Sequence, residues 1–199
     1  MPVLRSAARP RLLALLLAGC TALVLAATPP IDSSPRDPLP EYPVKAAFLY
    51  HFVEFVEWPQ ASPLPPATVT IGIVGRDPFG DVLDQAILEK MVAGRTLAIR
   101  RFASVEALEP CEILFISSSE MARLPKILAR LQQSPVLTVG EADRFARRGG
   151  MIGFFFEDGR VRLEVNRAAA ERSGLRISSK LLAVARLVNP DGGASAGGR

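Results

Sequence analysis

Residues 42–59, YPVKAAFLYHFVEFVEWP, decide how the rest of the chain folds. At 100° per residue the large apolar side chains fall on one side of a helix, and this side is wider than a surface helix needs. The apolar side consists of Val44, Phe48, Leu49, Phe52, Val53, Phe55 and Val56, and the polar side carries Tyr50, His51, Glu54 and Glu57. The pattern predicts a helix packed firmly onto a sheet and closed by Trp58-Pro59, because a residue before proline is disfavoured in helices.

Lys45 interrupts the apolar side in the first turn of this helix. One interpretation is that its long stem carries the ammonium past the helix end into water. The other is that the lysine points at an anion or at a carboxylate elsewhere in the fold, where the unpaired N–H groups of the helix start add positive potential. The sequence leaves both interpretations open.

The first 27 residues have the pattern of a secretory signal peptide. Three arginines, Arg5, Arg9 and Arg11, precede a 16-residue apolar run at 12–27, which is shorter than the roughly 20 residues of a membrane span. Residues 17–20, Leu-Ala-Gly-Cys, resemble a bacterial lipobox that would lipidate Cys20, whereas Ala26-Ala27 suits ordinary signal peptidase cleavage. Both alternatives predict an exported, periplasmic protein, and they differ only in whether it is anchored to a membrane.

Removing the three arginines lowers the formal net charge of the chain from +4 to +1. The basic character therefore belongs to the leader and does not favour a nucleic-acid partner. Cys111 is the only cysteine besides Cys20, so an internal disulfide in the mature chain is not expected. Cys111 opens an apolar run, which indicates a buried and inert thiol.

Three further segments complete the domain organisation. Residues 28–41, with five prolines, read as a stiff linker, and residues 191–199 read as a disordered tail. Residues 42–190 form one domain of about 150 residues, long enough for a substantial core.

Strand and helix signals alternate along this domain. Predicted strands lie at 69–74, 96–102, 113–116, 136–139, 151–157 and 161–165, and predicted helices at 79–90, 125–131, after Asn166 as far as Gly174, and 180–188, with a helical turn at 143–147. Asp158-Gly159 predicts a hairpin between the fifth and sixth strands. The fold class that we expect is an α/β three-layer sandwich with a mostly parallel open sheet and an antiparallel hairpin at one edge.

Ligands of open α/β sheets bind beyond the carboxyl ends of the strands, where the strand order reverses. Here those ends carry Arg76 and Asp77, the serines at 117–119 and Glu141. Arg76, Asp77, Ser117, Ser118 and Ser119, together with Lys45, are candidates for an anion-binding crevice. The same residues are also ordinary caps and turns, and the sequence favours that interpretation.

The sequence contains no constellation that would predict an enzyme or a cofactor. The glycine-rich phosphate-binding motifs and G-x-S-x-G are absent, and His51 is the only histidine. We therefore expect no catalytic residues, no metal ligands and no cofactor.

Seven blocks of the domain, in order, resemble the signature blocks of the YfiR family of exported bacterial proteins. They are VKAAFLY at 44–50, FVEWP at 55–59, DPFG at 77–80, CEILFIS at 111–117, VLTV at 136–139, GGMI at 149–152 and SSKLL at 178–182. The resemblance implies a non-enzymatic periplasmic repressor that binds the periplasmic part of an inner-membrane diguanylate cyclase and holds down cyclic-di-GMP synthesis. It also implies sequestration by an outer-membrane lipoprotein, and it leaves a homodimer open.

This chain departs from the studied repressor, which is cross-linked by disulfides and responds to redox state. With Cys111 as the only cysteine beyond Cys20, such control is not expected here. For a partner surface we predict Trp58, Phe155 and Tyr50, with Phe155 more exposed than its neighbours Phe154 and Phe156. The alternative function is a periplasmic sensor of a small ligand or anion.

Overall fold

The structure is a computed structural model that describes residues 40–59, 67–132 and 134–190. All of them belong to one compact unit, Asp37–Arg199. The predicted signal peptide with Cys20, nearly all of the linker and the tail at 191–199 lie outside the described residues. No helix in the described part of the chain combines the length and the apolar character that a bilayer span requires.

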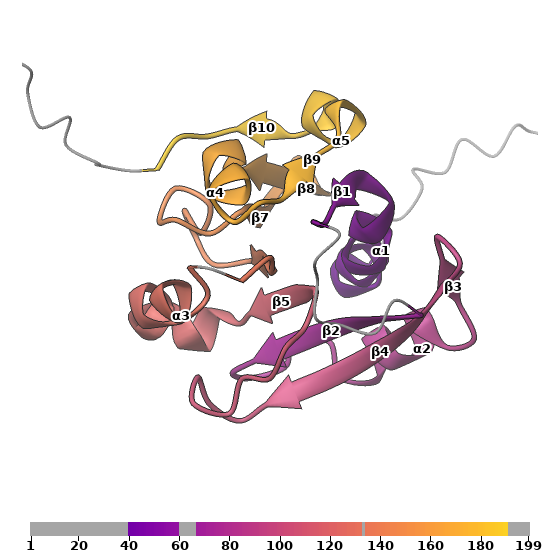
Figure 1. The fold of residues 1–199 in the computed structure, drawn as a ribbon. Helices are drawn as coiled ribbons and strands as arrows, with labels where there is room; N and C mark the ends of the chain where they lie inside the picture. The colour runs from indigo at the N-terminus through magenta and orange to yellow at the C-terminus, as the bar shows by residue number, and fades with distance from the viewer. Residues whose placement is uncertain (1–39, 60–66, 133, 191–199) are drawn as a thin grey trace, which may run out of the picture. The chain divides into compact units, whose positions relative to one another are not determined.

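An eight-stranded sheet forms the centre of the unit, with the strand order β10-β8-β7-β6-β5-β2-β4-β3 (Figure 1). Its long strands are β2 (Thr68–Val74), β4 (Arg95–Phe102), β5 (Ile113–Ile116), β6 (Leu137–Gly140), β7 (Ile152–Glu157) and β8 (Arg160–Val165), and β3 (Met91–Val92) and β10 (Arg186–Leu187) are short. Strands β4, β2, β5, β6 and β7 are parallel to one another, and β8 returns antiparallel to β7. The predicted α/β class with a mostly parallel sheet is therefore confirmed.

Helices cover both faces of this sheet. Helices α1 (Glu41–Phe55) and α2 (Asp81–Ile87) pack on one face, as do α4 (Arg167–Arg172) and α5 (Ser179–Val184), whereas α3 (Leu124–Arg130) packs on the other. Alternate residues of β5 show the division, because Phe115 belongs to the α1 core and Leu114 to the α3 core. The curled sheet wraps partly around α1, which contacts both β2 and β8 (Figure 1).

Local signals in the sequence form the turns and caps that they predict. Asp158 and Gly159 both have positive φ, 51° and 71°, as a two-residue hairpin between β7 and β8 requires. The Asn166 side chain accepts a hydrogen bond from the Ala169 N–H at 3.0 Å and so caps α4. The residues at 143–147, predicted as a helical turn, form turns in which the Arg148 N–H donates to Arg144 O at 2.9 Å.

The first helix differs from its prediction in two respects. It ends at Phe55, because Val56–Glu57 forms strand β1, which pairs antiparallel with β9 (Arg176–Ile177) in a separate two-stranded sheet. Tyr50, predicted on the polar side, is only 8% exposed. The ammonium of Lys90 covers it, 4.6 Å from the ring centroid and 3.1 Å from the hydroxyl.

The predicted edge hairpin β7–β8 is likewise not the outermost element. Strand β10 pairs parallel with β8 and lies outside it. At the opposite end, β3 turns back on β4 through Ala93 and Gly94, both with positive φ. Neither two-residue strand has a hydrophobic repeat of its own, so the sequence pattern contained no sign of them.

Candidate functional site

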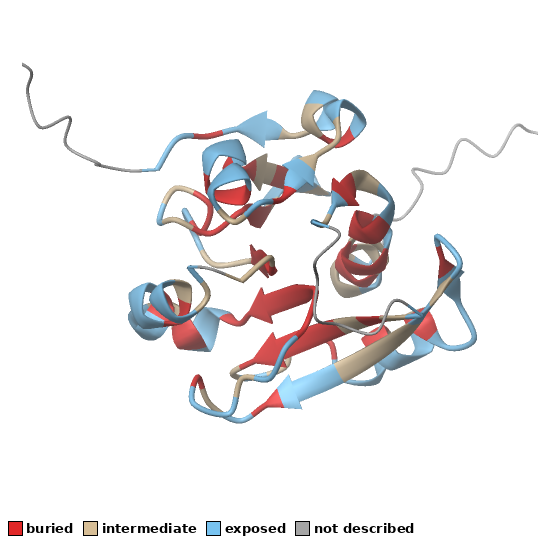
Figure 2. Ribbon diagram, in the orientation of Figure 1, coloured by how far each residue is buried: buried red, intermediate tan, exposed pale blue. Residues whose placement is uncertain are grey.

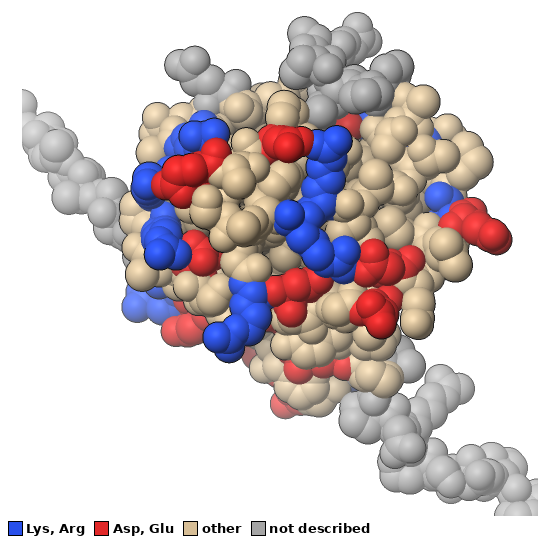
Figure 3. Space-filling view, turned by 90° about the horizontal axis from the view of Figure 1, so that it is seen from below, with Lys and Arg blue, Asp and Glu red and all other residues tan. Residues whose placement is uncertain are grey.

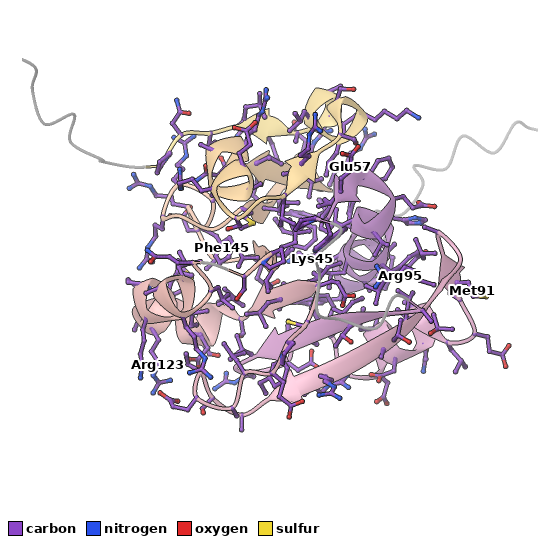
Figure 4. The ribbon with its side chains drawn as sticks, in the orientation of Figure 1. Lys45, Glu57, Met91, Arg95, Arg123 and Phe145 are labelled. Atoms are coloured by element: carbon purple, nitrogen blue, oxygen red, sulfur yellow. The ribbon has the colours of Figure 1, made fainter. Side chains whose placement is uncertain are left out.

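Lys45 is buried and holds two elements of the fold together. Its side chain is 5% exposed and points into the molecule from α1 (Figure 4). The ammonium donates to Glu141 at 2.6 Å, just beyond the end of β6, and to Glu41 one turn earlier on α1. It also lies 5.0 Å from the centroid of the Tyr42 ring. Of the two interpretations of Lys45, the one that directs it at a carboxylate elsewhere in the fold is therefore correct.

The pKa of Lys45 is raised above its ordinary value. Burial alone would lower this pKa, but the hydrogen bonds to Glu141 and Glu41 outweigh the loss of water. The lysine is thus a charged link between α1 and the sheet. Both of its carboxylate partners belong to the protein, so the ammonium is already neutralised.

The predicted anion crevice is closed by its own residues. The Arg76 N–H donates to Ser119 Oγ at 3.0 Å, and Ser117 Oγ accepts from the Ser119 N–H at 3.3 Å as the cap of a short 3-10 helix, η1 (Ser118–Arg123). Gly75 has φ +90°, and a Cβ placed there would lie 2.6 Å from Ser119 Oγ. The serine hydroxyl therefore fills the point where the strand order reverses. Ser118 is exposed and adds nothing to the cluster.

Asp77 belongs to a separate network of charges. One carboxylate oxygen accepts the Phe79 N–H at 2.7 Å, and the other accepts from Arg101 Nε at 2.7 Å. Arg101 also bonds Asp84 of α2, and this contact lowers the pKa of Asp84. No described contact joins Lys45 to this network or to the serine cluster. Five of the six candidate crevice residues therefore form three separate groups, and Ser118 belongs to none of them.

The three predicted partner-surface residues differ in their exposure. Phe155 is half-buried, with the Arg186 guanidinium 4.4 Å from its ring centroid, whereas Phe156 is 54% exposed. The expectation that Phe155 would be the most exposed of the three phenylalanines is wrong, because the Arg186 side chain lies against its ring and Phe156 lies nearer the hairpin tip. Tyr50 is buried, as described above. Trp58 is half-buried, and its Nε1 is buried without a hydrogen-bond partner among the described residues.

Titratable side chains with catalytic potential are few in the described part of the chain. His51 lies on the surface 2.8 Å from Glu54. Burial raises the pKa of the Cys111 thiol to about 12, so it is protonated at neutral pH. Within the described residues there is no group of three or more His, Cys, Asp or Glu side chains arranged to hold a metal ion.

A cavity of about 530 Å³ is lined by residues of α3 and α4 together with Thr138, Gly149 and Met151. Leu128, Leu131 and Met151 contribute apolar side chains to its wall, and Thr138 and Arg172 contribute polar groups in about equal measure. Thr138 Oγ1 already accepts the Met151 N–H at 3.1 Å. The cavity was not predicted, because two helices distant in the sequence create it.

Surface charges of both signs are interspersed. On the face shown in Figure 3, lysines and arginines lie among aspartates and glutamates. Some ion pairs of the described residues join exposed side chains, such as Arg100 with Glu109 and Lys126 with Glu106. Such pairs contribute little to stability because water screens them.

The scaffold defines the chain as a mixed α/β domain with a mostly parallel, curled sheet. The YfiR/HmsC-like family matches residues 42–186, and the chain belongs to this family. Membership supports a regulatory role in cyclic-di-GMP signalling; the family is regulatory and is not known as an enzyme family. None of the curated proteins compared with the sequence matches it.

Two solved structures resemble the fold at low sequence identity. A conserved domain protein from Vibrio cholerae O1 biovar El Tor has a TM-score of 0.51 and 15% identity, over 71% of this chain and 59% of that one. The ABC domain in complex with L-Trp from Streptococcus pneumonia has a TM-score of 0.49 and 12% identity, over 72% of this chain and 60% of that one. This chain thus spans about 60% of the length of these two structures.

Proposed function

We propose that the protein is a non-enzymatic periplasmic repressor that binds the periplasmic part of an inner-membrane diguanylate cyclase. The observation that carries the proposal is the family match across residues 42–186, which covers nearly the whole described unit. Burial keeps the Cys111 thiol protonated, so it is not poised as a nucleophile, which fits a protein that acts by binding.

Deletion and complementation test this function. Cells that lack the gene should contain more cyclic-di-GMP, and the complete gene should restore the lower level. A purified periplasmic domain of the cyclase should bind the protein in a pull-down. Unchanged cyclic-di-GMP under every growth condition tried would overturn the proposal.

Trp58 and His51 distinguish binding from turnover. A binding surface concentrates its energy in a few aromatic anchors, and Trp58 is only half-buried. Trp58→Ala should raise cyclic-di-GMP without lowering the melting temperature, whereas His51→Ala should change neither. If the melting temperature falls together with regulation, Trp58 belongs to the core and another surface binds the cyclase.

Periplasmic location is part of the proposal and has its own test. A fusion of alkaline phosphatase to the end of the chain should be active, because this enzyme folds only outside the cytoplasm. Cys20→Ser should preserve export in either case, but it should abolish labelling by a radioactive fatty acid if the lipobox is used. Export without any label in the unchanged chain would assign cleavage to Ala26 or Ala27.

The cavity between α3 and α4 favours a second candidate function, a small-ligand sensor. Its volume of about 530 Å³ falls within the range of natural ligand sites. Screening a metabolite library by thermal shift tests this function. A hit should lose its effect in Leu128→Trp, which fills the cavity, and retain it in the exposed control Ala122→Trp.

A further inference from the structure

Strand β4 leaves one edge of its backbone unpaired among the described residues. Its inner edge pairs with β2 along the whole strand, from Thr96 to Phe102. Its outer edge pairs only with β3, through Arg95 and Thr96. In Figure 2, β4 is tan and pale blue where β2 and β5 are red, which shows that it lies at the accessible margin of the sheet.

The direction of each backbone group follows from one hydrogen bond. The Thr96 N–H donates to Ala67 O at 2.9 Å, on the side of β2. Because backbone groups alternate along a strand, the N–H and C=O groups of Ala98 and Arg100 also face β2. Those of Leu97, Ile99 and Arg101 face outward. No described residue hydrogen-bonds the main chain of Leu97 or Ile99.

The two faces of this margin differ in chemistry. Leu97 and Ile99 are half-buried apolar residues packed against the α1 core. Arg100 projects from the opposite face and is 53% exposed. Its carboxylate partner Glu109 is itself 58% exposed, so Arg100 can leave Glu109 and pair with another carboxylate at little cost in free energy.

Charge disfavours a second copy of the chain as the occupant. The strand sequence RTLAIRRF contains three arginines and no acid. Two copies paired antiparallel about Ile99 would place the two Arg100 side chains diagonally across the seam without an acid in either strand. Exposed charges on edge strands block self-pairing in this way.

We propose that the outer edge of β4, from Leu97 to Arg101, binds an extended segment of a partner protein by strand addition. The segment that fits alternates acidic and β-branched apolar residues. Its backbone bonds the outward groups of Leu97, Ile99 and Arg101, its acids face Arg100, and its apolar side chains extend the row of Leu97 and Ile99. This surface does not depend on a cyclase as the partner, so its failure and that of the proposed function are separate.

The test measures binding of the peptide Ac-TEVEVET-NH2, with Ac-TKVKVKT-NH2 as the charge-reversed control, to the full chain. Amide hydrogen exchange followed by NMR provides the structural readout. In the free protein the amides of Ala98 and Arg100 should exchange slowly and those of Leu97, Ile99 and Arg101 should exchange fast. The acidic peptide should slow exchange at these three alone, and the basic peptide should not.

Two variants connect this binding to the edge. Arg100→Glu should weaken the acidic peptide about tenfold, because a favourable cross-strand pair becomes a like-charged one. Arg162→Glu, a matched change at an exposed arginine of β8, should leave the affinity unchanged. Ile99→Pro removes one outward N–H without breaking a bond to β2 and should also weaken binding.

Several outcomes would overturn the proposal. One is no binding at millimolar peptide, and another is binding that protects amides elsewhere. Protection of Leu97, Ile99 and Arg101 in the free protein at every concentration would mean that the chain covers its own edge. If these amides exchange more slowly in the free protein as its concentration rises, a second copy of the chain covers the edge.

Discussion

Replacing Lys45 with methionine tests whether a buried ion pair attaches α1 to the sheet. Methionine keeps most of the stem but removes the ammonium that contacts Glu141 at 2.6 Å. The Glu141 side chain, 12% exposed, would lose this cation and remain largely out of water. Removing one member of a buried pair typically costs 3–5 kcal/mol, and the partial exposure of Glu141 places the expected loss near the lower end, about 3 kcal/mol.

A loss of this size is readily measured. For a domain of about 150 residues it corresponds to a fall in melting temperature of about 6–12 °C. Urea denaturation followed by circular dichroism gives the free energy directly. Lys126→Met is the matched control, because Lys126 forms a pair with Glu106 whose two side chains are 67% and 65% exposed, so water screens it and its loss should leave the stability almost unchanged.

The double variant Lys45→Met/Glu141→Gln separates the pair from its surroundings. Once the unpaired carboxylate is gone, much of the stability lost in Lys45→Met should return, since an apolar and a neutral group replace the ions. The reasoning is refuted if Lys45→Met costs no more than Lys126→Met. It is also refuted if the two changes simply add, because contacting residues are expected to couple.

Three further predictions concern pH, packing and cross-linking. Because the pKa of Lys45 is raised, the charged lysine contributes its full stabilisation of the folded state below the ordinary value of 10.5, and this contribution is lost as pH rises through the folded-state pKa. The free energy of unfolding should therefore fall less steeply with rising alkaline pH in Lys45→Met. Phe52 is fully buried, and Phe52→Ala should cost about 3–5 kcal/mol in urea melts; a loss under about 1 kcal/mol would place it outside the core. A Cβ at Gly153 would lie 3.6 Å from that of Ala146, so Ala146→Cys/Gly153→Cys should form a disulfide on oxidation and add about 2 kcal/mol. A thiol assay under denaturing conditions that finds more free thiols in the oxidised variant than in the unchanged chain, which retains Cys111, would contradict this geometry.

Local pattern determined most of the secondary structure of this protein. The run ILFI at 113–116 forms a strand with the predicted bounds, Asp158-Gly159 forms the predicted hairpin turn, and Asn166 caps the helix that follows it. Each of these features depends on residues within a few positions of one another. Steric preferences and periodic burial therefore define it without any knowledge of the rest of the chain.

Contacts between distant residues decided the remainder. Glu141 lies 96 positions from Lys45, and only the packing of α1 against the sheet brings the two charges together. Tyr50 is buried because Lys90 covers it, although the sequence of α1 predicts that this side of the helix is polar. Among the described residues the outer edge of β4 is unpaired because β3 stops after two residues, and the periodicity of a segment does not tell which strands will flank it. Pairing and burial are properties of the assembled sheet, and for that reason they required the tertiary structure.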